Sequence, residues 1–352
     1  MSPSNANLYG LSRLGLGCYA LGGGYGKVDL AEARATVDAA LDAGWSVVDT
    51  AEAYLDSEER LGQILKGRRD KVFLATKVFP CESYLPVNIK RALTNSLAKL
   101  QTDYVDLYQL HGPQNWIIDF DDAASLDVIA QSLQESLDSG KVLNVGVCNM
   151  PIEVMKQLHS RVRLFSTQNL FSIFDDGSDH DEIHLPVGEQ IIPWAIENEV
   201  KFLAFSPLAR GLLADGQIPS RIFPPDDERH FLPRFQPEFF PDWARIANLL
   251  EVWAGDHGKT LVQLAIAWTL SRNGVSTTLI GAKTPQQVNA FAGSESFALS
   301  DGDLVEISNI VGMLSPTASA AKSIVWDHFP PEAVDAMRQR RHANSSVKQL
   351  SN

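Results

Sequence analysis

Short apolar runs alternate with amphipathic stretches along most of this chain, from residue 14 to residue 280. Strands that alternate with helices in one series lie parallel, because each helix carries the chain back across the sheet. Eight such strands in an uninterrupted series predict a closed (β/α)8 TIM barrel of the α/β class. We expect the strands at residues 14–18, 45–49, 71–77, 104–110, 142–147, 163–168, 201–205 and 276–280.

Two of the stretches between the expected strands have a clear helical pattern. Apolar side chains recur every three or four residues in 29–43 and again in 86–100. Asp29 is placed to cap the first helix and Gly44 to end it, while Pro86 suits the first turn of the second. These signals predict helices that cover the outside of the barrel.

The regular alternation is interrupted in two places. Residues 209–240 contain five prolines and show no clear period, which predicts a long loop at the rim of the barrel. Residues 314–352 follow the last helical pattern and end in polar sequence, which predicts a partly flexible C-terminal extension. We therefore expect a single barrel domain over residues 8–313, followed by that extension.

The composition of the chain narrows its setting and its partners. A net charge of −13 argues against nucleic acid or an anionic membrane surface as the main partner. We find no secretory signal at the start and no apolar run of the roughly 18–20 residues that cross a bilayer. The three cysteines show no CxxC spacing, which is typical of a reducing compartment. We predict a cytoplasmic protein and leave its number of subunits open.

Four chemically active side chains stand at or just after consecutive strand ends. Asp49 ends the second expected strand and Tyr54 follows it, Lys77 ends the third, and His111 follows the fourth. The carboxyl ends of the strands form the active rim of such a barrel. A lysine cation stabilises a phenolate, and a carboxylate can anchor the cation. Each residue alone could be a turn or cap residue, but together they predict protonation of a carbonyl oxygen during hydride reduction.

Four motifs give the chain a resemblance to the aldo-keto reductase family over roughly residues 8–300. They are VVDTAEAY, LATKV, DYVDLYQLHGP and AFSPLARGLL, in matching order. The resemblance implies an enzyme that reversibly reduces a small aldehyde or ketone with NADPH and without a metal. It implies that Tyr54 donates the proton, that Lys77 and Asp49 activate Tyr54, and that His111 orients the carbonyl.

The same resemblance implies a set of contacts with the cofactor. At the nicotinamide it points to Cys148, Asn149, Gln168 and Phe205. At the pyrophosphate it points to Ser206, Leu208, Arg210 and Gly211. At the adenosine phosphate it points to Gly281, Lys283, Thr284 and Gln287.

Two departures from the family pattern bear on the cofactor. Cys148 replaces the usual serine at the carboxamide, and a thiol is the weaker hydrogen-bond donor. Lys283 suits a 2′-phosphate and favours NADPH over NADH. However, Ala290 and Phe291 stand where the family has Glu-Asn at the adenine. The strictness of the NADPH preference is therefore open.

Other interpretations of the chain compete with this one. GLGCYA, residues 15–20, fits a dinucleotide-binding pattern and would suit a Rossmann-type dehydrogenase, but the helix pattern begins only near Asp29, so we prefer a tight barrel turn. HDEIH, residues 180–184, has two histidines at zinc-site spacing, but a solvated polar loop fits its flanks better. The third alternative is a non-catalytic nicotinamide-binding subunit, which would bind cofactor without turnover.

The substrate cannot be read from the sequence. Four aromatic residues of the expected rim loops could face an apolar or aromatic substrate, or could equally cover core surface. They are Trp116, Phe223, Phe231 and Phe235.

Overall fold

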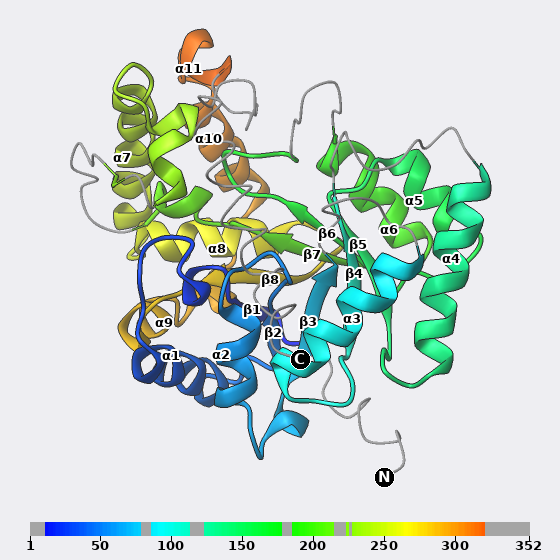
Figure 1. Cartoon of the computed structure of the whole chain (residues 1–352). Coiled ribbons are helices and arrows are strands. Elements are labelled where there is room, and N and C mark those ends of the chain that lie inside the picture. The colour runs from blue at the N-terminus through cyan, green and yellow to red at the C-terminus, as the bar shows by residue number, and fades with distance from the viewer. Residues whose placement is uncertain are drawn as a thin grey trace.

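Eight parallel strands close into a barrel in the order in which they occur along the chain, with β8 paired to β1 (Figure 1). The computed structural model describes residues 11–78, 86–112, 123–177, 185–214, 223–224 and 227–320. The strands are β1 (Leu14–Gly17), β2 (Val47–Asp49), β3 (Phe73–Val78), β4 (Leu107–His111), β5 (Val145–Cys148), β6 (Ser166–Leu170), β7 (Lys201–Phe205) and β8 (Val275–Gly281). This architecture confirms the predicted (β/α)8 fold.

Helices surround the barrel on its outside (Figure 1). The α-helices are α1 (Leu30–Asp42), α2 (Ser57–Ile64), α3 (Pro86–Leu100), α4 (Ala123–Asp138), α5 (Ile152–His159), α6 (Ile192–Glu197), α7 (Phe240–Asp256), α8 (Leu261–Ser271), α9 (Pro285–Ala290), α10 (Asp301–Val311) and α11 (Pro316–Ala320). The cap signals were read correctly: the Asp29 carboxylate accepts the Glu32 backbone N–H at 2.7 Å, and Gly44 follows α1 with φ of +84°. Short helical turns fill several connections: η2 (Ala20–Gly22), η3 (Arg69–Lys71), η4 (Val187–Ile191), η5 (Ala209–Gly211), η6 (Glu228–Phe231), η7 (Pro233–Phe235) and η8 (Ser294–Ser296).

An apolar layer fills the lower part of the barrel and supports the polar groups above it. Its buried members are Val47, Phe73, Ala75, Leu107, Leu203 and Leu279. A Cβ atom on Gly15 would lie 2.8 Å from Leu279 Cδ2 and 2.9 Å from Val47 Cβ, so only glycine fits there. GLGCYA therefore forms β1 and its following turn, as expected, and the Rossmann interpretation is wrong because the sheet is a closed barrel.

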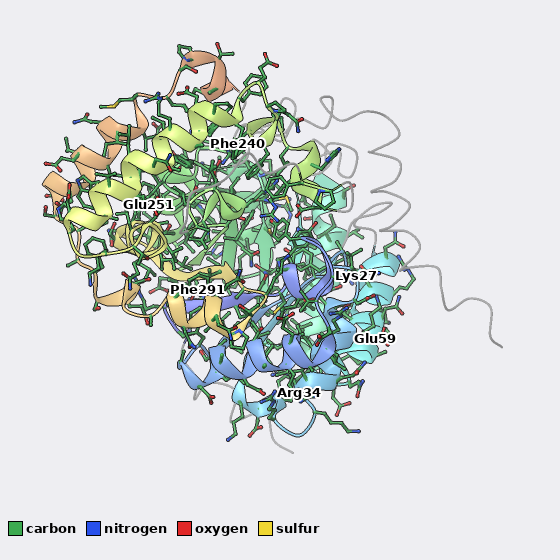
Figure 2. The ribbon with its side chains drawn as sticks, turned by 90° about the vertical axis from the view of Figure 1, so that its left-hand side faces the viewer. Lys27, Arg34, Glu59, Phe240, Glu251 and Phe291 are labelled. Carbon is green, nitrogen blue, oxygen red and sulfur yellow. The ribbon has the colours of Figure 1, made fainter. Side chains whose placement is uncertain are left out.

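The predicted rim loop is more structured than its prolines suggested. Its described residues contain η5, η6 and η7, and α7 begins at Phe240, the last residue of the segment expected to be a loop. The buried Arg234 guanidinium forms an ion pair with the buried Asp175 carboxylate and lies 4.7 Å from the centre of the Trp243 ring. Figure 2 shows α7 on the outer face of the molecule, with Phe240 and Glu251 along it.

The aromatic residues of this segment serve packing where the structure describes them. Phe223 and Phe235 are each 7% exposed, and their ring centres are 5.3 Å apart. Phe235 also stacks on Phe240. Of the two open interpretations, core packing is therefore the observed one for this pair. Trp116, the side chain of Phe231 and the HDEIH segment lie outside the described residues.

The described residues include the start of the predicted C-terminal extension, 314–320. Its described part contains α11, which packs against α7. Residues 321–352 lie outside the description. In the ranges given above, no helix has both the length and the apolar character needed to cross a membrane.

Candidate active site

The four predicted catalytic side chains meet at the carboxyl end of the barrel. Asp49 is the last residue of β2, Lys77 lies in β3, and His111 is the last residue of β4. The Lys77 ammonium donates to Asp49 Oδ1 at 2.6 Å, to the Thr50 carbonyl oxygen at 2.9 Å and to the Tyr54 hydroxyl at 3.3 Å. An ammonium has three protons, so this geometry gives each one an acceptor.

The charged pair at the centre is fully withdrawn from water. Lys77 is 0% exposed and Asp49 is 3% exposed. Burial lowers the pKa of the Lys77 ammonium, but the adjacent Asp49 carboxylate and Tyr54 outweigh it, so the net pKa is raised. Lys77 therefore stays charged, and its charge is held beneath the phenol.

The phenol of Tyr54 stays protonated at neutral pH. Burial raises its pKa and the Lys77 cation lowers it, and the net result is a pKa of about 12. The expected effect of the cation is present, but it offsets burial only in part. The Tyr54 hydroxyl is thus protonated, and one fixed ammonium lies beside it that would stabilise the phenolate form.

The imidazole of His111 lies beside the phenol. The two rings meet edge to face, with centres 5.9 Å apart. His111 is partly exposed at the barrel mouth. Tyr19, in the loop after β1, contacts Tyr54 from another side at 5.0 Å between ring centres. The mouth therefore offers a phenol and an imidazole next to each other.

The turn that carries Tyr54 is fixed by contacts that sequence reasoning missed. Thr50 Oγ1 donates to Ser57 Oγ at 2.8 Å, and Ser57 Oγ donates to the Cys18 carbonyl oxygen at 3.0 Å. A Cβ atom on Gly22 would lie 2.1 Å from the Tyr54 carbonyl oxygen. The GGG run at 22–24 was a visible signal of close approach.

A second missed residue is Glu58, at the start of α2. Its side chain is 1% exposed and accepts the Thr76 hydroxyl at 2.7 Å. The Lys99 ammonium, on α3, is 4.0 Å away. Burial raises the pKa of Glu58 despite these partners. Glu58 joins α2 to β3 at the residue next to Lys77.

Two of the residues predicted to bind the carboxamide are hydrogen-bonded to each other. One of them is also hydrogen-bonded to the predicted catalytic tetrad, which consists of Asp49, Tyr54, Lys77 and His111. Cys148 Sγ lies 3.8 Å from Gln168 Oε1, and Gln168 Nε2 donates to Asp49 Oδ2 at 2.9 Å. Burial raises the pKa of the Cys148 thiol to about 12, so it remains a neutral donor. Asn149 follows β5 with φ of +49° and is 8% exposed.

The predicted pyrophosphate segment follows β7 and has an unusual backbone. Ser206 and Arg210 have left-handed φ values of +57° and +60°, and Gly211 has φ of +94°. Such conformations cost energy for residues other than glycine and concentrate at binding sites. Phe205 and Leu208, partly exposed, lie beside this turn.

The predicted adenosine-phosphate segment follows β8 and leads into α9. Gly281 ends the strand, Thr284 caps α9 through the Gln287 backbone N–H, and Gln287 Oε1 accepts the Lys283 N–H at 2.7 Å. The Lys283 ammonium donates to the Tyr25 carbonyl oxygen. The site residues after β8 are thus held together as one turn.

Lys283 also lies near charged residues that are distant from it in the sequence. Burial lowers the pKa of its ammonium, and nearby Arg229 lowers it further, while Asp227 opposes the shift. Asp227 pairs with Arg229 at 2.6 Å and forms an antiparallel bridge with Tyr25. The loops after β1, β7 and β8 therefore meet around Lys283.

Phe291, which the sequence resemblance placed at the adenine, is a core residue. It is 3% exposed and stacks parallel to Trp45, with ring centres 6.1 Å apart. Figure 2 shows it beside α9, on the face that also carries Arg34 on α1. The Phe291 side chain therefore packs between the loops after α9 and α1.

The described residues contain no cluster of histidine, cysteine, aspartate or glutamate side chains that could hold a metal ion. The site instead combines a charged lysine, a protonated phenol and an imidazole at one mouth. This arrangement can donate a proton to an oxygen atom and stabilise the charge that remains.

Comparison with known proteins gives a consistent result. The profile described as "Aldo/keto reductase family" matches residues 13–311. The chain is similar to the aldo-keto reductase YhdN of Bacillus subtilis (strain 168), at 33% identity over 313 residues, covering 85% of this chain and 90% of that protein.

Solved structures resemble the chain as well. The glycerol dehydrogenase AKR11B4 from Gluconobacter oxydans has a TM-score of 0.73 at 28% identity, covering 87% of this chain and 93% of that one. An aldo-keto reductase from Klebsiella pneumoniae, solved in complex with NADPH, has a TM-score of 0.65 at 26% identity, covering 86% and 91%.

Proposed function

The chain belongs to the aldo/keto reductase family, and from that premise we propose that it reduces an aldehyde or ketone with NADPH, with Tyr54 as the proton donor. The observation that carries the proposal is the contact between the Lys77 ammonium and the Tyr54 hydroxyl, at 3.3 Å, at the mouth of the barrel. The reaction is reversible, and the same residues serve oxidation of the alcohol.

In this proposal each residue of the tetrad has one task. NADPH supplies the hydride when it is bound. Tyr54 gives its proton to the carbonyl oxygen as negative charge develops there, and Lys77 stabilises the phenolate that remains. Asp49 holds Lys77 in place and compensates its buried charge. His111 donates a hydrogen bond that orients the carbonyl.

Several features of the described residues suit the cofactor. Asn149 Oδ1 is a buried acceptor for which the described part of the chain supplies no donor, and a carboxamide N–H would satisfy it. The strained turn at Ser206 and Arg210 suits close contact with a pyrophosphate. Lys283 and its neighbour Arg229 would favour the 2′-phosphate of NADPH over NADH.

We also propose a reducing, cytoplasmic setting. Cys18 and Cys148 are both free and buried, and burial raises the pKa of each thiol. Neither thiol is therefore poised to form a disulfide.

The test is turnover of a panel of aldehydes and ketones, measured by loss of NADPH or NADH absorbance. Tyr54→Phe should lower the rate at least about 100-fold, because the phenolic proton is lost, while NADPH fluorescence quenching persists. Tyr104→Phe is the matched control, since Tyr104 precedes β4 at the opposite end of the barrel, and it should retain turnover.

Two outcomes would contradict the proposal. Full turnover by the Tyr54→Phe protein would remove Tyr54 as the donor. Tight NADPH binding with no turnover of any carbonyl would favour the non-catalytic, cofactor-binding subunit.

A further inference from the structure

One continuous chain of contacts runs from the predicted carboxamide residues to the predicted proton donor. Cys148 Sγ lies 3.8 Å from Gln168 Oε1, and Gln168 Nε2 donates to Asp49 Oδ2 at 2.9 Å. Asp49 Oδ1 accepts the Lys77 ammonium at 2.6 Å, and that ammonium reaches the Tyr54 hydroxyl at 3.3 Å. Four of these side chains are each no more than 3% exposed: Cys148, Gln168, Asp49 and Lys77.

We propose that Gln168 is a positioning residue for proton donation, acting through Asp49 on Lys77 and Tyr54. It thereby couples the carboxamide end of the cofactor site to the acid-base site. This inference rests on the proposed function, and it adds a role for Gln168 beyond contact with the nicotinamide.

The two carboxylate oxygens of Asp49 have different hydrogen-bond donors. Lys77 occupies one and Gln168 occupies the other. A buried carboxylate is costly unless its oxygens are paired, because no water replaces a missing donor. With both oxygens held, the carboxylate plane is fixed, and so is the ammonium bonded to it.

Removal of the Gln168 donor would leave Asp49 Oδ2 unpaired in the barrel. The carboxylate could then rotate or draw the ammonium more strongly towards itself, and in both cases the cation leaves the phenol. Because Lys77 is the group that lowers the pKa of Tyr54, that pKa would rise and Tyr54 would become a weaker acid.

Gln168 can orient Asp49 and still have hydrogen-bonding groups left for the carboxamide of the cofactor. Its amide nitrogen has two protons, of which Asp49 takes one, and its oxygen has two lone pairs, of which the weak Cys148 thiol uses one. One donor and one acceptor therefore remain for a carboxamide. A carboxamide that engages them would fix the amide that orients Asp49.

The decisive experiment is a double-mutant cycle between Gln168→Met and Asp49→Asn. Methionine has the length of glutamine but no donor. Asparagine at position 49 has a single acceptor oxygen, which the charged Lys77 would take, so Gln168 would lose its acceptor there. If Gln168 acts through Asp49, Gln168→Met is costly in the native background and nearly neutral in the Asp49→Asn background.

The cycle is measured in two ways. The first is the single-turnover reduction rate at saturating NADPH, where Gln168→Met should cost about 10-fold, the usual scale for a hydrogen bond to a charged group, and less than about 2-fold with Asp49→Asn. The second is the urea midpoint of the cofactor-free proteins, where the two losses should again be non-additive.

A matched control and a second variant complete the design. Asn149→Ala should weaken NADPH binding, and its effects should add to those of Asp49→Asn. Gln168→Asn keeps an amide but is one methylene shorter, so it retains polarity, loses reach and should repeat the non-additivity should Gln168→Met fold poorly.

Additive losses in both measurements would overturn the inference, as would a Gln168→Met protein in which only the Kd for NADPH changes. Failure of the proposed function has a different signature, since the native protein would then reduce no carbonyl. In that case the role in proton donation falls with the proposed function, and the urea cycle, which requires neither cofactor nor turnover, tests the coupling of Gln168 to Asp49 separately.

Discussion

Lys77 is the residue whose surroundings explain the arrangement of the whole tetrad. Its ammonium is fully buried, and each of its protons has an acceptor. Such a cation cannot retreat to water, so its position is set by Asp49 and the Thr50 carbonyl. The apolar layer, which includes Ala75 two residues earlier on β3, lies below these groups. A positive charge fixed beside Tyr54 lowers the pKa of its phenol and so makes it a stronger acid.

We expect Lys77→Met to destabilise the protein by about 3–5 kcal/mol, because it leaves the Asp49 carboxylate buried and unpaired. The Lys77→Met, Asp49→Asn double variant should recover much of that loss, since it removes the orphaned charge. Urea unfolding of the two proteins measures both values. Equal stability of the single and double variants would show that Asp49 finds another partner.

The elements matter because they hold the Tyr54 turn from outside the barrel. The turn η2 passes so close to the Tyr54 backbone that Gly22 has no room for a Cβ atom. Ser57, the first residue of α2, ties the same turn to β1 through the Cys18 carbonyl. Tyr54 is therefore positioned by the junction of β1, β2 and α2.

We expect Gly22→Ala to lower turnover by more than 10-fold, because its Cβ would meet the Tyr54 carbonyl oxygen at 2.1 Å and displace the turn. Gly255→Ala is the matched control: within α7 a Cβ on Gly255 meets nothing within 4 Å, so this change should raise stability by about 0.5–1 kcal/mol. Turnover and thermal unfolding of both variants provide the check. Native turnover by Gly22→Ala would mean that the turn can yield without cost.

The predicted strands can be compared with the observed ones. Alternation predicted eight strands, and strand ends predicted Asp49, Lys77 and His111, because both follow from local periodicity. Strand starts were wrong by up to three residues: β4 was expected from 104 but begins at Leu107, since Val105 only forms an isolated bridge. Apolar residues that lead into a strand look like the strand itself.

Contacts that exist only after the barrel closes could not be predicted. Gln168 meets Asp49 across 119 residues of chain, and Lys283 meets Tyr25 across 258. Neither pair has a local signature, because each depends on the order of strands around the barrel and on the path of its loops.

For the whole molecule, the buried carboxyl groups of Asp175 and Glu58 have opposite effects on how stability changes with pH. Arg234 holds the pKa of Asp175 below its ordinary value of 3.8, although burial acts against it. Its contribution to stability is present above that pH and is lost as the pH falls. Burial raises the pKa of Glu58 above its ordinary value of 4.5, so the contribution of Glu58 has the opposite sign.

The folded protein binds the Glu58 proton more tightly than the unfolded chain, so this part of the stability is complete below pH 4.5 and is lost as the pH rises through the folded pKa. Glu58→Gln keeps an acceptor for Thr76 but cannot ionise. We expect this variant to gain stability over the native protein as the pH rises above 4.5. Urea unfolding at several pH values measures the difference.

The neighbours of Glu58 limit the size of this effect without reversing it. Lys99 on α3 and the Ser96 and Thr76 hydroxyls favour the ionised form, while Glu52 disfavours it. Lys99→Met should therefore steepen the native loss of stability with rising pH, and it should do nothing comparable in the Glu58→Gln background. A difference between Glu58→Gln and native protein that does not change with pH would mean that Glu58 titrates alike in both states, and that burial at the junction of α2, α3 and β3 is fully offset by its hydrogen bonds.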